Sequence, residues 1–342
     1  MKHKTIHERT EFMNISVLLP DNDVRKMFIP SNVAKALENL GTVRWNKKEY
    51  EPENMIDLLK DCEVCVTGWG NPRLDETLLA NAKSLRLVVH SGGTVAPLVS
   101  DYLYDMGAKV VSGNDVFAEG VAEGTMAYIL AGLRLIPYYN SMVQAGNWKT
   151  NFCPNYSLLE KKVGLVGFGA IARYLTRMLH AFRTDIRVYD PYVDADAMKT
   201  YGVTKAESLD ALFSECEIIS LHLAQQPETY RLINKDLIKR MQDGALFVNT
   251  ARGSTVDEAA LAEELATGRI SAILDVFDTE PLPKDSKLRG LDNVILIPHM
   301  AGPPSDRFDK VVLTLIEDVK RLWAGEELRN EISRGYAFKM TT

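Results

Sequence analysis

The fold of this chain is decided by the stretch Lys162-Val163-Gly164-Leu165-Val166-Gly167-Phe168-Gly169-Ala170-Ile171-Ala172. It is a short apolar run that ends in closely spaced glycines. Behind it, apolar residues recur three and four positions apart, at Ile171, Leu175, Met178, Leu179 and Phe182. This order predicts a strand, a tight turn and a helix, and Gly167-x-Gly169-x-x-Ala172 has the spacing of a dinucleotide-binding turn.

The residues of this turn suit a bound pyrophosphate. Gly167 permits the tight turn, Gly169 lets a pyrophosphate approach the backbone, and the N-terminus of the helix favours an anion. Glycines also serve ordinary turns, so the pattern alone is a weak signal. Asp190 is more discriminating, because it ends a second predicted strand, 186–189, and follows Gly169 by 21 residues. An acid there accepts hydrogen bonds from a ribose 2′-OH and repels a 2′-phosphate, which predicts NAD as the cofactor.

The composition is that of a globular protein with two domains. The chain has 342 residues, which is long for a single domain. Its net charge is −6, so we expect no nucleic-acid partner. Residues 1–13 are expected to be a disordered leader, because they are polar and lack the apolar segment of a signal peptide. No apolar run approaches membrane-spanning length, so we expect a cytoplasmic protein without a membrane partner.

The chain contains four cysteines: Cys62, Cys65, Cys153 and Cys216. The Cys62-x-x-Cys65 spacing fits a metal half-site or a redox pair. However, the pair lies in an alternating, strand-like segment, and no second pair of this spacing follows. We therefore expect reduced thiols in and near a strand, and no metal site.

The first part of the chain alternates between strand-like and helix-like segments. Strands are expected at 15–19, 42–45, 64–67, 85–89 and 108–111, with helices at 31–40, 52–59 and 72–82 and another that ends at residue 106. Such alternation predicts a parallel sheet covered by helices. A long helical pattern, 117–145, follows a loop of small polar residues, 112–115, which we interpret as a crossing between domains.

A second alternating series begins with the glycine stretch. Its strands are expected at 164–166, 186–189, 218–222, 245–249, 270–275 and 294–297, and six strands suit a complete dinucleotide-binding sheet. An amphipathic helix is expected at 308–323, after Gly302-Pro303-Pro304. The predicted fold class is therefore α/β, with two parallel-sheet domains.

Three polar side chains follow three consecutive strands of the second series: Arg252, Glu280 and His299. Ligands of such sheets bind outside the carboxyl ends of the strands. A histidine can exchange the proton that accompanies hydride transfer between a nicotinamide and a 2-oxo or 2-hydroxy acid. A carboxylate holds such a histidine in one tautomer, and a guanidinium binds a substrate carboxylate through two parallel hydrogen bonds. Each residue alone has an ordinary structural explanation, but together they predict catalysis.

Two further groups are candidates for binding. His222 also stands at a strand end, and we expect it to line the cofactor site rather than to act as an acid. Ser91-Gly92-Gly93-Thr94 follows a strand of the first series and precedes a helix, so its amides could hold a substrate carboxylate at that helix terminus. The alternative for this loop is an ordinary turn between strand and helix.

Several longer stretches carry a family resemblance: Val121-Ala-Glu123, Val166-Gly-Phe-Gly-Ala-Ile-Ala172, Tyr189-Asp-Pro191, His222-Leu-Ala-Gln-Gln-Pro227-Glu-Thr229, Asn249-Thr-Ala-Arg-Gly253, Val256-Asp-Glu-Ala-Ala-Leu261, Leu274-Asp-Val-Phe277, Glu280-Pro281 and Pro298-His-Met-Ala-Gly302. With these, the chain resembles the D-isomer-specific 2-hydroxyacid dehydrogenases, which include D-glycerate, D-lactate and D-3-phosphoglycerate dehydrogenases. The resemblance covers roughly residues 60 to 325 in one register.

The resemblance implies a Rossmann NAD-binding domain, residues 115–303, inserted in a flavodoxin-like substrate domain, residues 14–114 and 304–342. It implies Arg252 as substrate anchor, Glu280 as the partner of the histidine and His299 as acid and base. The cofactor-binding residues are expected to be Gly167, Gly169, Ala170, Ile171, Asp190, His222, Leu223, Thr250, Asp275 and Gly302. Members of the family usually form dimers through the NAD-binding domain, so a homodimer is expected.

The substrate loop departs from the family's pattern. The family commonly has Gly-x-Gly-x-Asp there, whereas this chain has Gly92-Gly93-Thr94-Val95-Ala96. The loop 148–156 is also unlike the usual linker. The sequence therefore predicts a small 2-hydroxy or 2-oxo acid without naming it, and the low positive charge of these loops favours an unphosphorylated one.

A second function stays open at this point. An NAD(H)-sensing corepressor or scaffold protein of the same fold would keep the same three polar residues. The short, plain tails of this chain carry no long interaction region, which favours the dehydrogenase.

Overall fold

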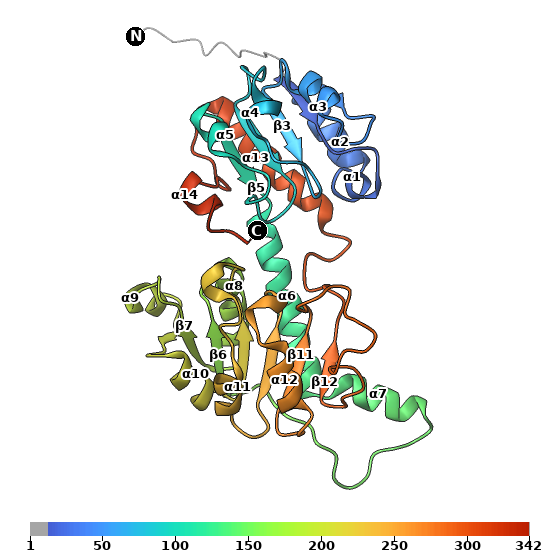
Figure 1. Cartoon of the computed structure of the whole chain (residues 1–342), viewed down its shortest axis with the longest axis vertical. Helices are drawn as coiled ribbons and strands as arrows, with labels where there is room; N and C mark the ends of the chain where they lie inside the picture. The colour runs from blue at the N-terminus through green and yellow to red at the C-terminus, as the bar shows by residue number, and fades with distance from the viewer. Residues whose placement is uncertain (1–12, 342) are drawn as a thin grey trace, which may run out of the picture. The chain divides into compact units, whose positions relative to one another are not determined.

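The computed structural model describes residues 13–341, which form two compact units (Figure 1). Unit 1 comprises residues 13–117 and 304–340, and unit 2 comprises residues 118–303 and 341. The predicted leader lies outside the described residues except for Met13. For this residue the prediction is wrong, because Met13 begins a strand, pairs with Gly41 and packs its side chain in a core.

Unit 1 contains a five-stranded parallel sheet of order β2-β1-β3-β4-β5. Its strands are β1 (Met13–Val17), β2 (Gly41–Trp45), β3 (Val64–Thr67), β4 (Leu87–His90) and β5 (Lys109–Ser112). The three central strands are apolar and almost wholly buried, as expected where helices cover both faces of a parallel sheet. The chain changes direction across the sheet between β1 and β3, and ligands of such sheets bind at this switch point.

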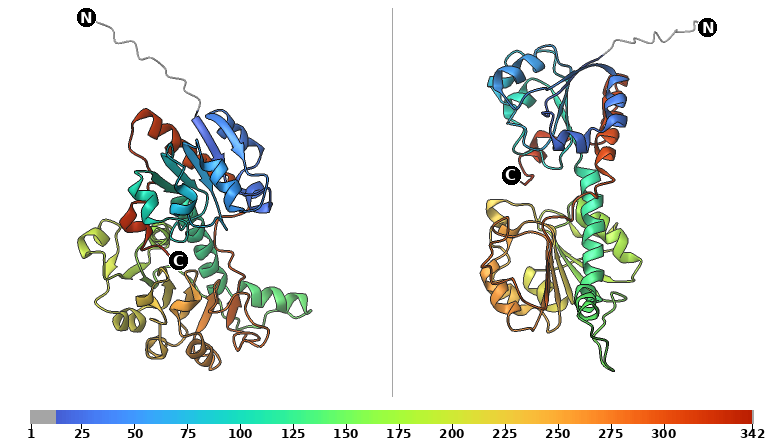
Figure 2. Two further views of the ribbon diagram at one scale, coloured as in Figure 1. Left: turned by 45° about the horizontal axis from the view of Figure 1, so that its top comes forward. Right: turned by 90° about the vertical axis from the view of Figure 1, so that its right-hand side faces the viewer.

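Helices cover both faces of this sheet, as the right-hand view of Figure 2 shows. One face packs against α1 (Asp23–Phe28), α2 (Ser31–Glu38) and α13 (Phe308–Ala324). The other packs against α3 (Pro52–Leu59), α4 (Glu76–Leu79), α5 (Asp101–Asp105) and α14 (Arg334–Ala337). Polar caps begin several of them: the side chains of Asn22, Asp75 and Ser100 each accept a hydrogen bond from an amide of the first turn.

Unit 2 contains a seven-stranded parallel sheet of order β12-β11-β10-β9-β6-β7-β8. Its strands are β6 (Lys162–Val166), β7 (Asp185–Tyr189), β8 (Thr204–Lys205), β9 (Ile218–Leu221), β10 (Leu246–Asn249), β11 (Ser271–Leu274) and β12 (Val294–Leu296). Six of these were predicted. The edge strand β8 was missed, because two residues are too short to show an alternating pattern. The two parallel sheets with their covering helices confirm the predicted α/β class.

The helices of unit 2 also lie on both faces of its sheet. One face packs against α6 (Asn114–Leu133), α8 (Ala170–His180) and α9 (Ala195–Lys199). The other packs against α10 (Leu209–Glu215), α11 (Lys235–Arg240) and α12 (Glu258–Leu265). The remaining elements are α7 (Ile136–Gln144) and two 3₁₀ turns, η1 (Pro227–Thr229) and η2 (Gly253–Thr255).

The single helix predicted for 117–145 is wrong. The structure has two helices, because Leu135 adopts a left-handed φ of 51° and Pro137 cannot continue α6. Among the described helices, α6 alone is long and apolar enough to cross a membrane by length and composition, which the sequence analysis had not expected. Its apolar face packs on the sheet of unit 2, where Gly124 lets it approach the backbone of Ala301.

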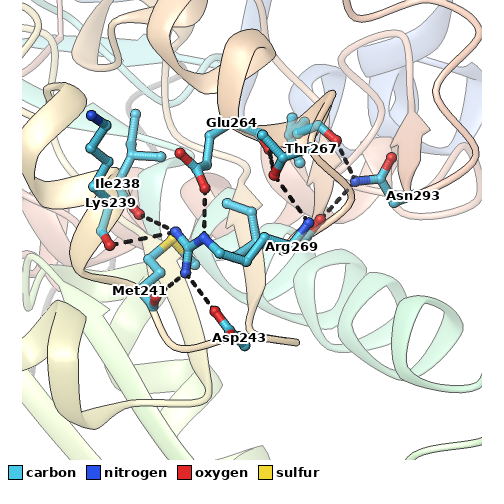
Figure 3. A network of polar contacts seen from close by, with 10 residues as sticks. Ile238, Lys239, Met241, Asp243, Glu264, Thr267, Arg269 and Asn293 are labelled. Carbon is cyan, nitrogen blue, oxygen red and sulfur yellow. Dashed lines mark hydrogen bonds and ion pairs between the residues drawn. The ribbon is translucent and has the colours of Figure 1, made fainter.

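Arg269 joins several elements at the amino edge of this sheet (Figure 3). Its Nε donates to Glu264 at the end of α12, at 2.6 Å, and Nη2 donates to the carbonyl of Ile238 in α11, at 3.2 Å. Nη1 donates to the carbonyl of Met241 and to Asp243. This polar network lies at the edge opposite the strand ends that carry Arg252 and His299, so we interpret it as structural.

The cysteines are free thiols, as predicted. Cys62, Cys65 and Cys216 are buried, and Cys62 donates from Sγ to the carbonyl of Val64, at 3.1 Å. Among residues 13–341 no cluster of three potential metal ligands occurs.

Candidate active site

The glycine turn between β6 and α8 presents open backbone amides. Gly167 has a φ of 95°, and a Cβ there would lie 2.7 Å from the carbonyl oxygen of His222, so only glycine fits. A Cβ on Gly169 would meet no atom within 4 Å, which leaves that side of the turn accessible. The amides of Gly169, Ala170 and Ile171 donate to no acceptor within the described part of the chain. The start of α8 is therefore suited to bind an anion.

Asp190 lies directly beside this turn. Its Oδ2 accepts a hydrogen bond from the amide of Phe168, at 2.9 Å, and its Oδ1 accepts one from the amide of Tyr192, at 2.8 Å. The carboxylate at the end of β7 is thus held next to the glycines, as the spacing in the sequence had suggested. Its negative charge opposes the binding of a phosphate at the same place.

His222 is partly buried after β9, and its backbone carbonyl lies against the glycine turn. Its Nε2 hydrogen-bonds with the hydroxyl of Ser220, at 3.0 Å, and its buried Nδ1 has no partner among residues 13–341. Burial lowers the pKa of His222 from 6.5 to about 4. The ring is therefore neutral at physiological pH, which agrees with a role in lining a site rather than in proton transfer.

His90 and His222, whose pKa values are lowered by burial of their rings, should make the protein acid-sensitive. Burial also lowers the pKa of His90 to about 4, so between pH 6.5 and this value each histidine takes up a proton only when its unit unfolds. For each histidine, the free energy of unfolding is expected to fall by about 2 kcal/mol as the pH is lowered from about 7 to about 5. Urea titrations at the two pH values check this. His222→Gln should weaken the loss, whereas an equal loss in wild type and variant would contradict it.

Arg252 follows β10 in a loop whose path depends on Gly253. A Cβ on Gly253 would lie 1.9 Å from the carbonyl carbon of Phe277, so the loop passes against the backbone that leads to Glu280. Asn249 closes the loop, because its side chain donates to the carbonyl of Arg252, at 3.1 Å, and accepts from the amide of Ala251, at 3.0 Å. Burial lowers the pKa of Arg252, and the Glu280 charge opposes this effect. That Gly253 permits this approach depends on the tertiary structure and is not evident from the sequence.

Glu280 and His299 are in direct contact. The Nδ1 of His299 lies 2.8 Å from Oε2 of Glu280, and the other carboxylate oxygen accepts from the amide of Phe277, at 3.0 Å. Burial alone would raise the pKa of Glu280, but the hydrogen bonds from His299 and Phe277 and the charge of Arg252 together lower it. The carboxylate therefore stays ionised and assigns the proton of the neutral ring to Nδ1.

The second ring nitrogen of His299 is open. The side chain is 50% exposed, and Nε2 has no hydrogen-bond partner in the described residues. With Nδ1 bound to Glu280, the ring can exchange a proton only through Nε2. This is the arrangement that a general acid or base requires.

Asp275 holds the backbone that carries His299, which has a left-handed φ of 55°. The carboxylate of Asp275 accepts hydrogen bonds from the amides of Met300, at 2.7 Å, and Ala301, at 3.0 Å, and its carbonyl accepts from His299. Burial and the charge of Asp275 raise the pKa of Tyr128 to about 12, and its hydroxyl also reaches the carboxylate. The resemblance implies a cofactor contact for Asp275, and this stays a prediction. The hydrogen bonds by which Asp275 holds the backbone around His299 were not predicted.

The other predicted cofactor residues lie around the same strand ends. Thr250 is buried after β10 and hydrogen-bonds with Thr125 of α6, at 2.9 Å. Leu223 is partly buried after β9, and Gly302 follows Ala301 with no atom within 4 Å of a built Cβ. These positions agree with a binding surface along the carboxyl edge of the unit 2 sheet.

In unit 1 the predicted substrate loop, Ser91–Thr94, follows β4. The expected reason for anion binding there is wrong, because α5 begins only at Asp101 and its N-terminus is not at the loop. The amides of Gly92 and Gly93 nevertheless have no acceptor among the described residues, and the buried hydroxyl of Ser91 has no partner. His90 holds the loop in place, because its ring hydrogen-bonds to the backbone of Thr94. Its Nδ1 also lies 3.0 Å from the hydroxyl oxygen of Thr67.

Comparisons with known proteins agree with this geometry. The sequence model of the D-isomer specific 2-hydroxyacid dehydrogenase NAD binding domain matches residues 126–301. D-3-phosphoglycerate dehydrogenase of Methanocaldococcus jannaschii is 32% identical over 87% of this chain and 57% of its own length. Hydroxypyruvate reductase of Thermotoga maritima is 30% identical over 85% of this chain and 94% of its own. A phosphoglycerate oxidoreductase structure from Rhizobium etli superposes with a TM-score of 0.81 at 25% identity, covering 94% of this chain and 98% of its own.

The chain spans about half the length of the D-3-phosphoglycerate dehydrogenases that it matches. It spans nearly all of the hydroxypyruvate reductase. The relatives therefore share the two units, and the longer ones contain a further part that has no counterpart in this match.

Proposed function

Because this chain belongs to the D-isomer-specific 2-hydroxyacid dehydrogenase family and carries its NAD-binding domain, we propose that it interconverts a small D-2-hydroxy acid and its 2-oxo acid with NAD. The observation that carries the proposal is the contact between His299 and Glu280, which leaves one ring nitrogen open for proton exchange. The test is turnover. The purified protein is expected to oxidise NADH with a small 2-oxo acid such as glyoxylate, hydroxypyruvate or pyruvate, and no turnover with a broad panel would contradict the proposal.

The residues of unit 2 fit the dinucleotide. The open amides of Gly169 and Ala170 suit the pyrophosphate, and Asp190 suits the ribose. The unpartnered Nδ1 of His222 is a buried polar atom in the same place, which is consistent with a bound group near the glycine turn.

When bound, the nicotinamide supplies or accepts the hydride. During reduction, His299 donates the proton at Nε2 to the substrate oxygen, and during oxidation it accepts that proton. Glu280 holds the ring and stabilises its protonated form. Arg252 binds the substrate carboxylate and polarises the adjacent carbonyl with its fixed, always charged guanidinium.

Unit 1 carries the other predicted substrate-binding residues, Ser91–Thr94. The amides of Gly92 and Gly93 have no acceptor among the described residues, and Gly93 is partly exposed, so these two amides are candidate donors to an anion. We assign them to substrate binding on these grounds, in place of the helix-terminus argument that the structure overturned.

Replacing Asp190 should change the choice of cofactor. In Asp190→Ser the charge that opposes a 2′-phosphate is removed, so the preference for NADH over NADPH, expressed as a ratio of kcat/KM, should fall by roughly 10²-fold. Steady-state kinetics with the two cofactors measure the ratio. Asp194→Ser, at the cap of α9, is the matched control and should keep the wild-type ratio. A wild-type preference for NADPH would contradict the assignment of Asp190.

A homodimer through unit 2 is also part of the proposal. Many of its exposed large apolar side chains lie in α7 and the loop that follows: Ile136, Tyr138, Val143, Trp148, Phe152, Tyr156 and Leu159. A clustered apolar surface of this kind is typical of a protein–protein interface. Light scattering should report a dimer for wild type and a monomer for the double variant Trp148→Asp/Phe152→Asp. Tyr192→Asp changes an exposed aromatic residue elsewhere in the unit and is the control, which should stay a dimer. A monomeric wild type would contradict it.

The three relatives described above are all named for oxidoreductase activity, and no contact in the described residues favours the corepressor alternative. The dehydrogenase is therefore the function that we propose.

A further inference from the structure

Trp69 is an exposed aromatic residue at the carboxyl edge of the unit 1 sheet. It follows β3, the strand beside the switch point, and 43% of its surface is accessible. Its ring packs edge-on against Phe28, Phe117 and Phe308, at centroid distances of 5.0, 5.9 and 6.0 Å. Three phenylalanines thus hold the indole, and less than half of it stays exposed, at the place where ligands of such sheets bind.

The loop around Trp69 is fixed by polar contacts. The hydroxyl of Tyr50 donates to the carbonyl of Trp69, at 3.3 Å, and the side chain of Asn71 accepts from the amide of Gly68, at 3.1 Å. Burial raises the pKa of Tyr50 to about 12, so its hydroxyl stays protonated and remains a donor. The indole is therefore presented by a rigid turn, which reduces the entropy that a ligand must overcome when it packs there.

The indole lies against the loop that carries the open amides. A Cβ on Gly92 would lie 2.4 Å from Nε2 of His90 and 3.1 Å from Cδ1 of Trp69, so the His90 ring requires glycine at position 92 and the indole lies close beside it. Gly92 and the Cδ1 edge of Trp69 are therefore neighbours. In a 2-oxo acid the carboxylate and the side chain are separated by a single carbonyl carbon, so one small molecule can reach both surfaces.

This part of unit 1 offers little positive charge. Residues 68–71 and 91–94 contain no lysine or arginine. His90, beneath the second loop, is neutral at physiological pH because its pKa is about 4. The guanidinium of Arg25 is bound to the carbonyl of Asn46, at 2.6 Å, and to Asp21, at 2.7 Å. These two loops therefore supply no cationic partner of the kind that a phosphorylated side chain needs.

We propose that Trp69 forms the side-chain subsite of the substrate, and that the substrate is an unphosphorylated 2-oxo acid with an apolar side chain. The inference rests on the proposed function for the identity of the reacting group. It adds the chemical class of the side chain, which neither the family nor the catalytic residues determine. It also separates this chain from relatives that are named for phosphoglycerate.

Turnover with three probes tests the subsite. We expect wild type to have a kcat/KM for phenylpyruvate at least tenfold above that for 3-phosphohydroxypyruvate. Trp69→Ala should lower kcat/KM for phenylpyruvate about ten- to hundredfold, mainly through KM, and should change that for glyoxylate less than about threefold. Trp323→Ala is the control, since this indole packs on Arg86 at the other end of α13, about 22 Å along the helix from Phe308.

A binding measurement separates this inference from the proposed function. In His299→Ala saturated with NADH, calorimetry should show phenylpyruvate binding that weakens about tenfold or more when Trp69→Ala is added. Binding that depends on Trp69 without turnover in the wild type would support the subsite and contradict the dehydrogenase. Three results would overturn the subsite without contradicting the proposed dehydrogenase activity. They are turnover that does not change in Trp69→Ala, an equal loss of kcat/KM with all three acids, and a wild-type preference for 3-phosphohydroxypyruvate.

Discussion

Replacing His299 with alanine is expected to lower kcat for 2-oxo acid reduction by roughly 10²- to 10⁴-fold, the contribution of a positioned general acid. The imidazole is held at Nδ1 by Glu280, and its open Nε2 is the proton donor of the proposed mechanism. Alanine removes the donor without burying a charge, and the side chain is half exposed, so the fold should survive. Steady-state kinetics with NADH measure the loss, and NADH affinity should change little.

The control for this variant is His180→Ala. His180 lies at the end of α8 in the same unit, where its Nε2 contacts the carbonyl of Tyr201, at 2.8 Å. It stands just before the start of β7, at the edge of the sheet opposite the strand ends of the candidate site, and carries no role in the mechanism, so kcat should stay close to wild type. Added imidazole should restore part of the activity of His299→Ala only. An active His299→Ala protein would show that another group supplies the proton.

The second large effect is expected from Arg252→Met. The side chain keeps much of its length but loses the guanidinium, so the substrate carboxylate loses a charged, two-point partner. The expected loss in kcat/KM is roughly 10²- to 10³-fold, about 3–4 kcal/mol of transition-state binding. Arg252→Lys should recover only part of it, because an ammonium group cannot form two parallel hydrogen bonds with the carboxylate.

Arg231→Met is the matched control for Arg252. The amide of Arg231 bonds to the carbonyl of Ser254 in the same loop, and its half-exposed guanidinium pairs with Asp278, at 3.5 Å. This pair is at the surface, so its loss should change kcat/KM by less than about threefold. If Arg231→Met and Arg252→Met were equally impaired, the loop rather than the Arg252 guanidinium would be responsible.

Much of the fold follows from local sequence signals. The glycine turn and the acid at Asp190 predicted the strand, turn and helix of unit 2, because these residues must satisfy backbone constraints that few others can. The failures have local causes too. β8 has only two residues, and the break between α6 and α7 depends on the left-handed backbone of Leu135. Met13 was assigned to a leader, because its pairing with Gly41 depends on a strand 28 residues away.

The residues of the candidate site could be predicted where the proposed chemistry requires a particular residue type. The residues that hold those side chains in place could not be predicted, because their role depends on tertiary contacts. Strand-end positions indicated Arg252, Glu280 and His299, and the structure has the last two in contact. The support of His299 by Asp275, through the amides of Met300 and Ala301, depends on backbone geometry that the sequence does not display. The clustering of Trp69 with three phenylalanines from distant segments was equally hidden.

We propose that the identity of the acid is governed by residues outside the proposed catalytic set. Relatives that share this family act, by their names, on phosphoglycerate or hydroxypyruvate, so the common machinery does not select the side chain. In this chain the loop after β3 presents the exposed indole of Trp69, and residues 68–71 contain no lysine or arginine. Substrate choice and catalysis should therefore be separable by mutation, with Trp69 affecting KM for apolar acids and His299 affecting kcat for all acids.

The central claim is that the pair of His299 and Glu280 serves an NADH-dependent reduction of a 2-oxo acid. The most direct test is chiral analysis of the product formed by wild type and by His299→Ala with NADH and a 2-oxo acid that the enzyme turns over. The account predicts one D-2-hydroxy acid formed for each NADH consumed by wild type, and almost none by the variant. Formation of the L-isomer, or equal product from both proteins, would contradict it.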